Sequence, residues 1–358
     1  MSFSHPQASR KQPTHNSKTL PEIDNHTKHS QAGLLSLIPP HSEPYKHSDT
    51  HQNIHLKPLS TPITSPNTSI HTHPPHLAHS IPCKLNWGVT LMMTAIHLIA
   101  FLFAYTYWSW SAVGVCMVLS FLTGCIGVSM GMHRLFSHRT FKVSKQISYI
   151  IGLFSTLAFQ GPIAEWVARH RMHHAGSDTH EDPHNVKRGF FYAHMGWLLY
   201  HNDHFNHPNK IKAYSRDILQ DPVLKFMSTR IFMITAQCVL ALLLWLIGGM
   251  PWLVWGTFVR LAINYHSTWL VNSAAHLWGY KTYPTNDEAR NNWWVALLTW
   301  GEGWHNNHHA HASSARIGHK RWEIDITHWM ILLLAKLGLA SDIKDATQKP
   351  KKKTAKIN

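Results

Sequence analysis

Four long apolar runs organise the chain from residue 84 onward. They cover residues 86–107, 110–132, 231–249 and 251–272. Each is close to the ~20 residues that a helix needs to cross a ~30 Å hydrocarbon core. Short turns, around Ser109 and around Gly248–Pro251, join the first run to the second and the third to the fourth. The pattern predicts an all-α protein with four transmembrane helices.

A further apolar stretch, residues 146–164, is bounded on both sides by charged, His-rich sequence. A fifth span here would invert the orientation of everything after it, so we expect a re-entrant or interfacial helix. Residues 165–225 and 277–345 are more polar and include a Trp-rich amphipathic stretch at 291–300. We predict that they form a cytoplasmic helical cap.

Charge gives the predicted helices an orientation. Neither short turn contains Lys or Arg, whereas residues 133–230 contain thirteen. Because positive loops stay on the cytoplasmic side, we expect both termini and the middle segment there. The net charge of +15 also raises nucleic acid as a partner. No nucleic-acid-binding motif is visible, and a cytoplasmic membrane face explains the charge better.

The two ends of the chain have a different composition. Residues 1–80 have no apolar period and carry 12 of the 32 histidines, among many Pro, Ser and Thr. We predict a disordered tail, whose scattered histidines could at most bind metal weakly. No apolar segment of a secretory signal occurs near residue 10. Residues 346–358 form a basic C-terminal tail, in which Lys349–Lys356 holds five lysines suited to anionic lipid. The membrane domain between the tails is placed at 84–345.

A few polar or reactive residues stand out. The cysteines have no CxxC spacing, so buried thiols are expected rather than a zinc ribbon or disulfides. They are Cys83, Cys116, Cys125 and Cys238. Arg260 lies inside the fourth apolar run. A charge inside a membrane span suggests a functional site. A purely structural role, in which Arg260 pairs with the backbone or with Tyr and Asn neighbours, is the alternative, and both explanations stay open.

Three histidine patterns carry the candidate chemistry. HRLFSH occupies 133–138, just past the second apolar run, HRMHH occupies 170–174 and HNNHH occupies 305–309. In the last two, histidines at i, i+3 and i+4 lie on one face of a helix. The eight histidines are His133, His138, His170, His173, His174, His305, His308 and His309. So many converging imidazoles would repel one another when protonated, whereas neutral imidazole is a good metal ligand.

The number of histidines constrains the metal. A structural zinc site has four ligands, often cysteines, so eight histidines imply two metals. Imidazole suits zinc, copper, iron and nickel. Two irons in an apolar setting fit oxygen activation. Zinc-dependent hydrolysis remains an alternative, although it needs water and a general base at a lipid surface.

The flanks of these motifs resemble a known family. EWVARHRMHHAGSDTHEDPHNVKRGFF (165–191), NSAAHLWG (272–279) and RNNWWVALLTWGEGWHNNHH (290–309) are similar to the integral-membrane delta-9 acyl desaturases. The similarity runs over about residues 84–345 and looks closest to bacterial, cyanobacterial and plant acyl-lipid members. It implies a cytoplasmic di-iron centre (two Fe ions) held by nine histidines.

The resemblance also implies roles that spacing alone does not give. His276 would be the ninth ligand, beside the eight histidines above, and Asn272 would hold a metal-bound water. Asp178 and Asp182 would accept hydrogen bonds from ligand imidazoles, although a turn or helix cap also explains them. Gln160, Trp166, Thr268 and Trp269 match residues that bend the acyl tunnel, although the tryptophans could simply pack at the membrane interface.

The implied activity is O2-dependent insertion of a cis double bond at or near position 9 of a saturated acyl chain. Two electrons are needed per turnover, and the sequence has neither an HPGG segment nor a four-cysteine iron–sulfur set. We therefore expect a separate donor, a ferredoxin or a cytochrome-b5-type protein, which would suit a basic face. The alternatives are an acyl or alkane hydroxylase with the same site and a non-enzymatic metal carrier.

The residues expected to contact the acyl carrier differ from those of one part of the family. Animal members bind acyl-CoA through polar and basic residues, and four of those positions differ here. They are Gly161, Ala168, His201 and Asn202. Losing donors to the CoA phosphates should weaken CoA binding. The sequence therefore favours an acyl chain on a membrane glycerolipid, with acyl-CoA and acyl-carrier protein still open.

Overall fold

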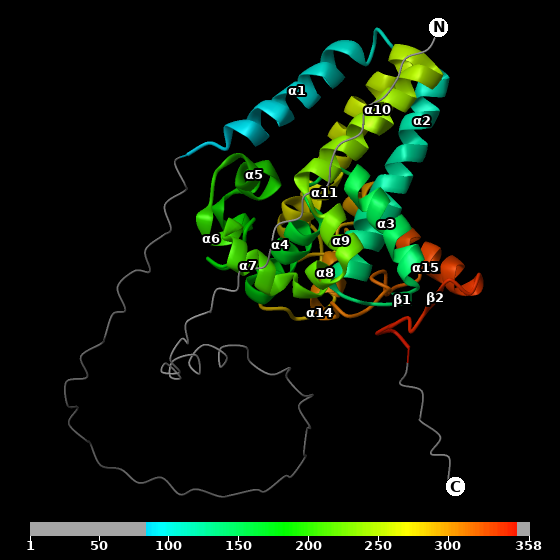
Figure 1. Cartoon of the computed structure of the whole chain (residues 1–358). Helices are drawn as coiled ribbons and strands as arrows, with labels where there is room; N and C mark the ends of the chain where they lie inside the picture. Colours follow the sequence, from blue (N-terminus) through cyan, green and yellow to red (C-terminus); the bar gives the residue numbers. More distant parts are fainter. Residues whose placement is uncertain (1–83, 349–358) are drawn as a thin grey trace, which may run out of the picture. The chain divides into compact units, whose positions relative to one another are not determined.

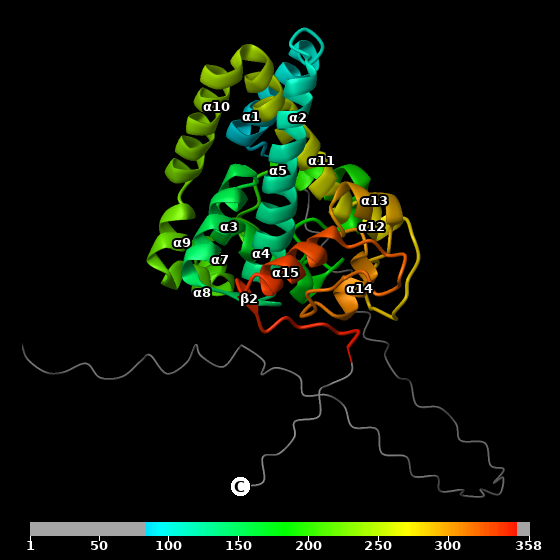
Figure 2. The same ribbon diagram turned by 90° about the vertical axis from the view of Figure 1, so that its right-hand side faces the viewer.

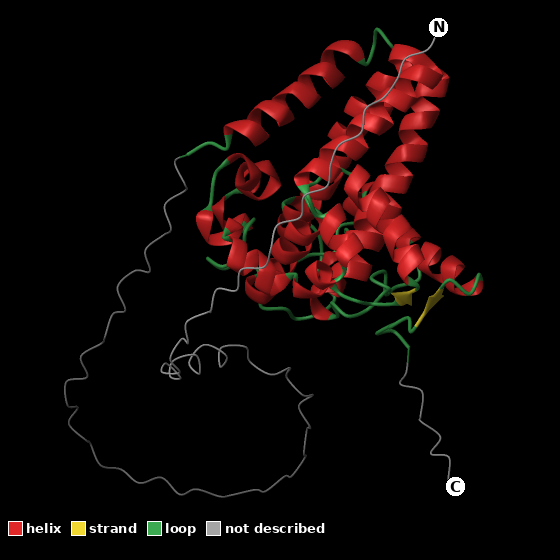
Figure 3. Ribbon diagram, viewed as in Figure 1, coloured by secondary structure: helices red, strands yellow, loops and turns green. Residues whose placement is uncertain are grey.

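A computed structural model describes residues 84–348, all of which lie within one compact unit of the chain. This part is mostly helical, with two very short strands (Figure 3). The predicted tail 1–80, Cys83 and the segment Lys349–Lys356 lie outside the described residues.

The elements follow one another along the chain. They are α1 (Trp87–Phe103), α2 (Trp110–Ser120), η1 (Phe121–Ser137), β1 (Lys142–Val143), α3 (Lys145–Leu157), α4 (Ile163–Gly176), η2 (Val186–Arg188), η3 (Tyr192–Gly196), α5 (Trp197–Leu199), α6 (Asp203–Asn206), α7 (Pro208–Tyr214), α8 (Arg216–Gln220), α9 (Pro222–Met227), α10 (Arg230–Leu253), η4 (Val254–Val259), α11 (Arg260–Asn272), α12 (Ala274–Leu277), α13 (Trp293–Leu298), α14 (His305–Ala310), α15 (Ile326–Lys336) and β2 (Ala340–Ser341).

The apolar runs form helices. α2 and η1 continue as one helix of 28 residues, and Arg230–Leu277 is helical over 48 residues. A straight helix of that second length would measure ~72 Å, more than twice a hydrocarbon core. Instead Gly249 adopts a left-handed φ of 64°, and the chain reverses at the end of α10 (Figure 2). The turn expected at Gly248–Pro251 is therefore present, near the end of α10, and it separates most of α10 from the helix that continues through η4 into α11.

The first apolar run is shorter than expected. α1 has 17 residues and ends at Phe103, not at residue 107. Its start is fixed by Asn86, whose side chain accepts a hydrogen bond from the Val89 N–H at 3.3 Å. A helix of this length measures ~26 Å, which is at the lower end of what crosses a bilayer.

The expectation of one helix over 146–164 was wrong. α3 ends at Leu157, the chain turns, and α4 begins at Ile163. Phe159 and Gly161 both have positive φ, 57° and 102°. Pro162 adds to this break because proline disfavours helical geometry in the residue before it. With 13 residues, α3 is too short to span a membrane.

Many apolar side chains of the long helices point away from the protein. Phe101 is 84% exposed and Ile231 is 80% exposed. Only 17% of the most apolar window of Arg230–Leu277 is buried, which distinguishes it from the core helix of a soluble protein. Exposed apolar surface of this kind indicates association with a membrane. Cys238 lies exposed on α10, contrary to expectation, because no other part of residues 84–348 covers it, while Cys116 and Cys125 are buried.

Arg260 is fully buried and bonds only to neutral acceptors. It donates to Gly256 O at 2.7 Å, Leu157 O at 2.9 Å, Thr123 Oγ1 at 3.1 Å and Gln237 Oε1 at 3.2 Å. These contacts join α11 to η1, α3 and α10. Of the two explanations left open by the sequence, the structural one is favoured.

The more polar segments gather at one end of the apolar helices, where α4, α8 and α14 lie (Figure 1). The two strands pair antiparallel there, Lys142 with Ser341 and Val143 with Ala340. This ladder ties the segment after η1 to the segment after α15. Apart from it, the expectation of a helical protein holds for residues 84–348.

Candidate metal centre

The HRLFSH histidines lie at the polar end of the second apolar helix. His133 is in the last turns of η1, and His138 caps its C-terminus. η1 has π-helical geometry, and the His138 N–H donates to His133 O at 3.1 Å. The two imidazole centroids are consequently only 4.9 Å apart.

The other two motifs are helical, as their spacing predicts. HRMHH lies in α4 and HNNHH begins α14. The intervening asparagines hold α14 in place. Asn306 Oδ1 accepts the Thr282 N–H at 2.7 Å, and Asn307 Nδ2 donates to Ile317 O at 2.9 Å. The histidine face of α14 is thereby left free to point at α4.

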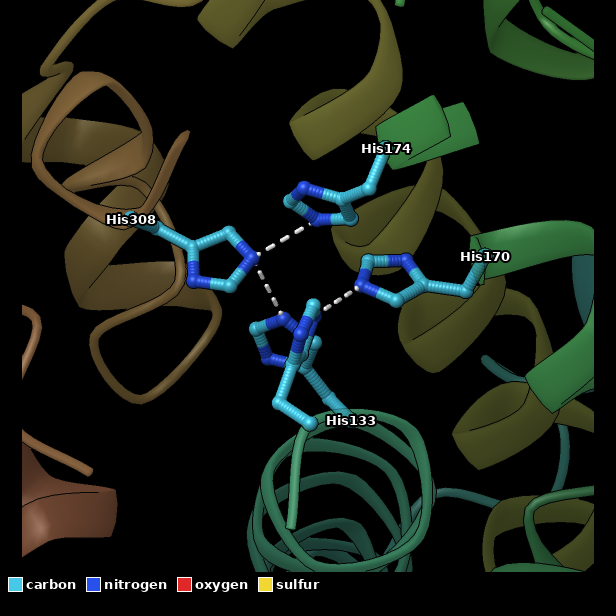
Figure 4. Close-up of side chains that lie close together, drawn as sticks. His133, His170, His174 and His308 are labelled. Atoms are coloured by element: carbon cyan, nitrogen blue, oxygen red, sulfur yellow. Dashed lines mark hydrogen bonds between the residues drawn. The ribbon is translucent and has the colours of Figure 1, made fainter. Parts of the chain in front are cut away.

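Nine histidines form two groups, in each of which the candidate ligand nitrogens all lie within 4.8 Å of one another. The first group is His133, His138, His170, His174 and His308, and the second is His173, His276, His305 and His309. Figure 4 shows His133 from η1, His170 and His174 from α4, and His308 from α14 pointing toward one another.

The separations within each group are short. In the first, Nε2–Nε2 distances are 2.7 Å for His138–His170, 2.9 Å for His174–His308 and 3.0 Å for His133–His308. In the second, His276–His305 and His305–His309 are 3.1 Å apart and His173–His309 is 3.2 Å. Two nitrogens bound to one ion at ~2.0–2.1 Å lie about 3 Å apart. Each group therefore fits one metal ion.

His276, which only the resemblance implied, falls inside the second group. It lies on the short helix α12, and its side chain is buried. Asn272 ends α11 one turn earlier and lines the space beside His170 and His173. No spacing rule reaches His276, because it is a single histidine far in sequence from its partners.

Both expected carboxylates face histidines of the second group. Asp178 Oδ2 lies 3.0 Å from His276 Nδ1, and Asp182 Oδ2 lies 2.9 Å from His173 Nδ1. Asp178 has a positive φ of 58°, and its N–H donates to Asp182 at 2.9 Å. A carboxylate that accepts the Nδ1 proton fixes the ring and leaves Nε2 for a metal.

Two more carboxylates face the Nδ1 atoms of histidines in the two groups. The sequence did not predict them. Glu302 Oε2 lies 2.6 Å from His133 Nδ1, and Asp287 Oδ2 lies 2.6 Å from His309 Nδ1. Glu302 stands three residues before His305, and that proximity to a histidine motif was a usable signal. Asp287 had none, because it lies in an irregular segment between α12 and α13.

Glu302 is also part of a buried ionic network. Its Oε1 accepts hydrogen bonds from Arg134 Nε at 3.1 Å and Nη2 at 3.0 Å, and from the Ser129 hydroxyl. Arg134 also pairs with Asp325 at 2.8 Å. Burial opposes ionisation of Glu302, but His133 and Arg134 lower its pKa to about 2. The carboxylate is therefore charged where it faces His133.

His184 adjoins the second group without making a third site. Its Nδ1 lies 3.5 Å from Asp182 Oδ1, and its ring centroid is 4.3 Å from that of His173. It could ligate only together with His173 and Asp182. Since His173 already belongs to the second group, His184 is better described as packing behind it.

Burial keeps most of the ligand candidates neutral. The pKa of each of six histidines is well below its usual value, first because of burial and then because neighbouring histidines would repel a second charge. They are His138, His170, His174, His305, His308 and His309. Neutral imidazole is the form that binds zinc, copper, iron or nickel.

Two cavities meet at the histidines. The larger is about 880 Å³ and the smaller about 60 Å³, and both are lined by Trp166, His170, Thr268 and Asn272. All four residues expected to shape a tunnel, including Gln160 and Trp269, line the larger cavity. Gln160 Nε2 donates to Thr268 Oγ1 at 2.8 Å.

The positions that differ from the acyl-CoA pattern fall in two places. Gly161, His201 and Asn202 line the larger cavity. Ala168 does not, because its side chain is fully buried in a core with Met172 and Phe205. Only three of the four differences therefore bear on what the cavity can bind.

Comparison with known proteins places these features in context. Residues 108–333 match the family model "Fatty acid desaturase". An sn-1 stearoyl-lipid 9-desaturase of Anabaena variabilis is 46% identical over 274 residues, which are 76% of this chain and 99% of that protein. An sn-2 palmitoyl-lipid 9-desaturase of Nostoc sp. (strain 36) is 42% identical over 73% of this chain and 90% of its own length. An acyl-CoA C20 Delta5-desaturase of Anemone leveillei is 40% identical over 74% and 83%.

Proposed function

Because the chain belongs to the fatty acid desaturase family, we propose that it inserts a cis double bond at or near position 9 of a saturated acyl chain esterified to a membrane glycerolipid. The observation that carries this proposal is that a large cavity reaches His170 and adjoins a smaller cavity lined by histidines of both groups. Relatives named as stearoyl- and palmitoyl-lipid 9-desaturases support the position and the lipid carrier.

The nine histidines are proposed to hold two iron ions, one in each group. The groups provide five and four imidazole nitrogens and no thiolate, which suits iron better than a structural zinc site. Bound iron would supply O2 activation, the chemistry needed to remove hydrogen from an unactivated methylene. Asn272 is proposed to hold a water beside the first group.

Four carboxylates orient the histidine rings for metal binding. Asp178 and Asp287 are hydrogen-bonded to the Nδ1 atoms of His276 and His309. Asp182 and Glu302 lie 2.9 and 2.6 Å from the Nδ1 atoms of His173 and His133. Two of these contacts involve HxxHH histidines: Asp182, in the segment after α4, holds His173, and Asp287, in the segment between α12 and α13, holds His309. This leaves Nε2 of every such ring directed into the centre without rearrangement.

The cavity positions the acyl chain. The acyl chain is proposed to lie in the larger cavity, with its bend where this cavity meets the smaller one. Gln160 and Thr268 hold that bend by their mutual hydrogen bond. Trp166 stacks on the His170 ring with centroids 5.1 Å apart, so a chain crossing this point passes beside the first group. Holding one methylene pair there makes the reaction selective.

The membrane arrangement is also a proposal. α1, α2 with η1, α10, and η4 with α11 would form four spans, and residues 84–345 the whole membrane domain. The absence of Lys and Arg from both short turns supports a cytoplasmic position for the polar end and both termini. The exposed apolar faces of α1 and α10 support contact with lipid.

The charges that line the larger cavity bear on whether the acyl chain is carried by a glycerolipid or by CoA. The polar lining of this cavity includes Glu165, Arg169 and Arg230. Arg169 and Arg230 both pair with Glu165, at 2.8 and 2.9 Å. Both guanidiniums share this one carboxylate, and Lys212 also lines the cavity, so the lining keeps a net positive charge suited to phosphate groups. The relatives named as lipid 9-desaturases, and not this charge, favour a glycerolipid. The acyl-CoA relative makes acyl-CoA the alternative that a direct test must address.

The decisive experiment is expression in a host that lacks delta-9 unsaturation, followed by analysis of acyl chains within each lipid class. We expect a cis-9 double bond in intact glycerolipids, and none with His173→Ala at equal protein level. A hydroxylated chain without a double bond would identify a hydroxylase instead. Unsaturation that persists in the His173→Ala variant would refute the site.

A further inference from the structure

Trp304 is a buried tryptophan that contacts residues of both histidine groups and a second tryptophan at the protein surface. It is 2% exposed and caps α14, immediately before His305 of the second group. Its carbonyl accepts the N–H of His308, a member of the first group, at 3.2 Å. Trp304 is thus joined by a peptide bond to one candidate ligand and by a hydrogen bond to another.

The Trp304 indole touches a second tryptophan that reaches the surface. Trp322 is 55% exposed, and the two ring centroids lie 5.4 Å apart in an edge-to-face contact. The Trp304 Nε1–H donates to Ile324 O at 2.8 Å, which fixes the buried ring against the segment that carries Trp322.

A buried carboxylate anchors that segment to α14. Glu323 Oε2 accepts from Asn307 Nδ2 at 2.8 Å, and Glu323 Oε1 accepts from the Tyr280 hydroxyl at 2.5 Å. Asn307 lies between the histidines of HNNHH. The exposed Trp322 is therefore held in a fixed position relative to the metal centre, unlike an aromatic side chain on a loose loop.

The surroundings of Trp322 are positively charged. Lys320 and Arg321 precede it, both are exposed, and neither side chain has an acidic partner within residues 84–348. The Lys320 ammonium lies over the Tyr280 ring at 4.4 Å and 5.7 Å from the Trp322 ring. We call Lys320, Arg321 and Trp322 the Trp322 surface. An aromatic centre with a cationic rim is complementary to an acidic protein.

We propose that the Trp322 surface is the docking site of the electron donor and that electrons pass through Trp322 and Trp304 to the histidine-bound centre. The donor is a small acidic one-electron carrier of the ferredoxin or cytochrome-b5 class. This rests on the proposed function, which requires electrons. Each docking oxidises one reduced donor and delivers one electron. Two such electrons, two hydrogens from the acyl chain and two protons reduce one O2 to two waters.

The other aromatic contact to a ligand does not serve this role. Trp166 stacks directly on His170. However, Trp166 lines both cavities and would be covered by the acyl chain during turnover. Trp322 lies outside both linings and stays accessible while substrate is bound.

The test uses the full-length, iron-loaded protein in lipid nanodiscs. Oxidation of a reduced [2Fe–2S] ferredoxin, and separately of soluble cytochrome b5, is followed by stopped-flow absorbance, and donor affinity is measured with iron-free protein as well. Dithionite serves as a small reductant that needs no docking. The variants are Trp322→Ala, Trp322→Phe and Lys320→Glu with Arg321→Glu. Trp329→Ala, also at an exposed tryptophan, and Lys225→Glu on α9 are the matched controls.

We expect Trp322→Ala to slow donor oxidation roughly tenfold or more while dithionite reduction is unchanged, as for loss of an aromatic interface anchor. Trp322→Phe should recover most of the rate. The charge-reversal pair should weaken donor affinity about tenfold and flatten its salt dependence. Donor rates and affinities that match the controls would overturn the proposal, as would weaker membrane attachment without a donor effect. Failure of dithionite to reduce wild-type protein would refute the proposed function instead, and donor affinity would still test the surface.

Discussion

Replacing Glu302 tests how far one outer carboxylate determines metal binding. Glu302→Gln keeps a side-chain oxygen that can accept from Arg134 but removes the charge 2.6 Å from His133 Nδ1. Loss of such a partner lowers metal affinity by about 10–100-fold, or ~1.4–2.7 kcal/mol. We expect iron to dissociate more readily from the first group, which contains His133, than from the second.

Glu302→Ala should have a second effect. It leaves Arg134, which is 1% exposed, with Asp325 as its remaining carboxylate. Breaking a buried ion pair costs about 3–5 kcal/mol, so this variant should also unfold at a clearly lower temperature. Glu302→Gln should keep most of the stability because its oxygen still faces the guanidinium.

The assay is competition with an iron chelator, with iron counted by elemental analysis and unfolding followed by circular dichroism. Glu288→Gln is the control, because that carboxylate is partly exposed and makes only a 3.5 Å contact with Arg290. If Glu302→Gln retains two irons with unchanged affinity, the carboxylate does not orient His133 and the reasoning fails.

Three further predictions follow from the cavity, the tail and the buried arginine. Gln160→Leu removes the hydrogen bond to Thr268 and should broaden the position of the double bond, measured by mass spectrometry of derivatised fatty acids; an unchanged cis-9 product would show that the pair does not set the bend. Deletion of residues 1–80 should leave desaturation within about twofold in a host assay, because both histidine groups lie within residues 84–348; lost activity at equal expression would assign the tail a role. Arg260→Met leaves four acceptors without their donor and should cost ~1–3 kcal/mol of stability. The loss should appear as a lower unfolding temperature in detergent, whereas normal stability with lost activity would favour a functional role for Arg260.

The sequence predicted the elements whose signal is local. The i, i+3, i+4 spacing placed HRMHH and HNNHH on helices, and the apolar runs marked the long helices. The break between α3 and α4 was missed, although Gly161 and Pro162 stand there, because the apolar pattern continues across it. Glycine followed by proline was the available local signal.

Contacts between distant segments were harder to predict. His276 came only from resemblance, and Asp287 from neither spacing nor resemblance, because each meets its partner through the packing of α12 and α14. Glu302 reaches His133 across 169 residues. No periodic pattern reports such a pairing, since it depends on how η1 and the segment before α14 pack together.

The central claim is that the nine histidines hold two irons. It is tested most directly by counting metal in the purified full-length protein, expressed with ample iron and zinc, and by recording its Mössbauer spectrum. The account predicts two irons per chain with the signature of a high-spin pair, falling to at most one when His276 is replaced by alanine. A chain that holds zinc instead, or that keeps both irons without His276, would contradict it.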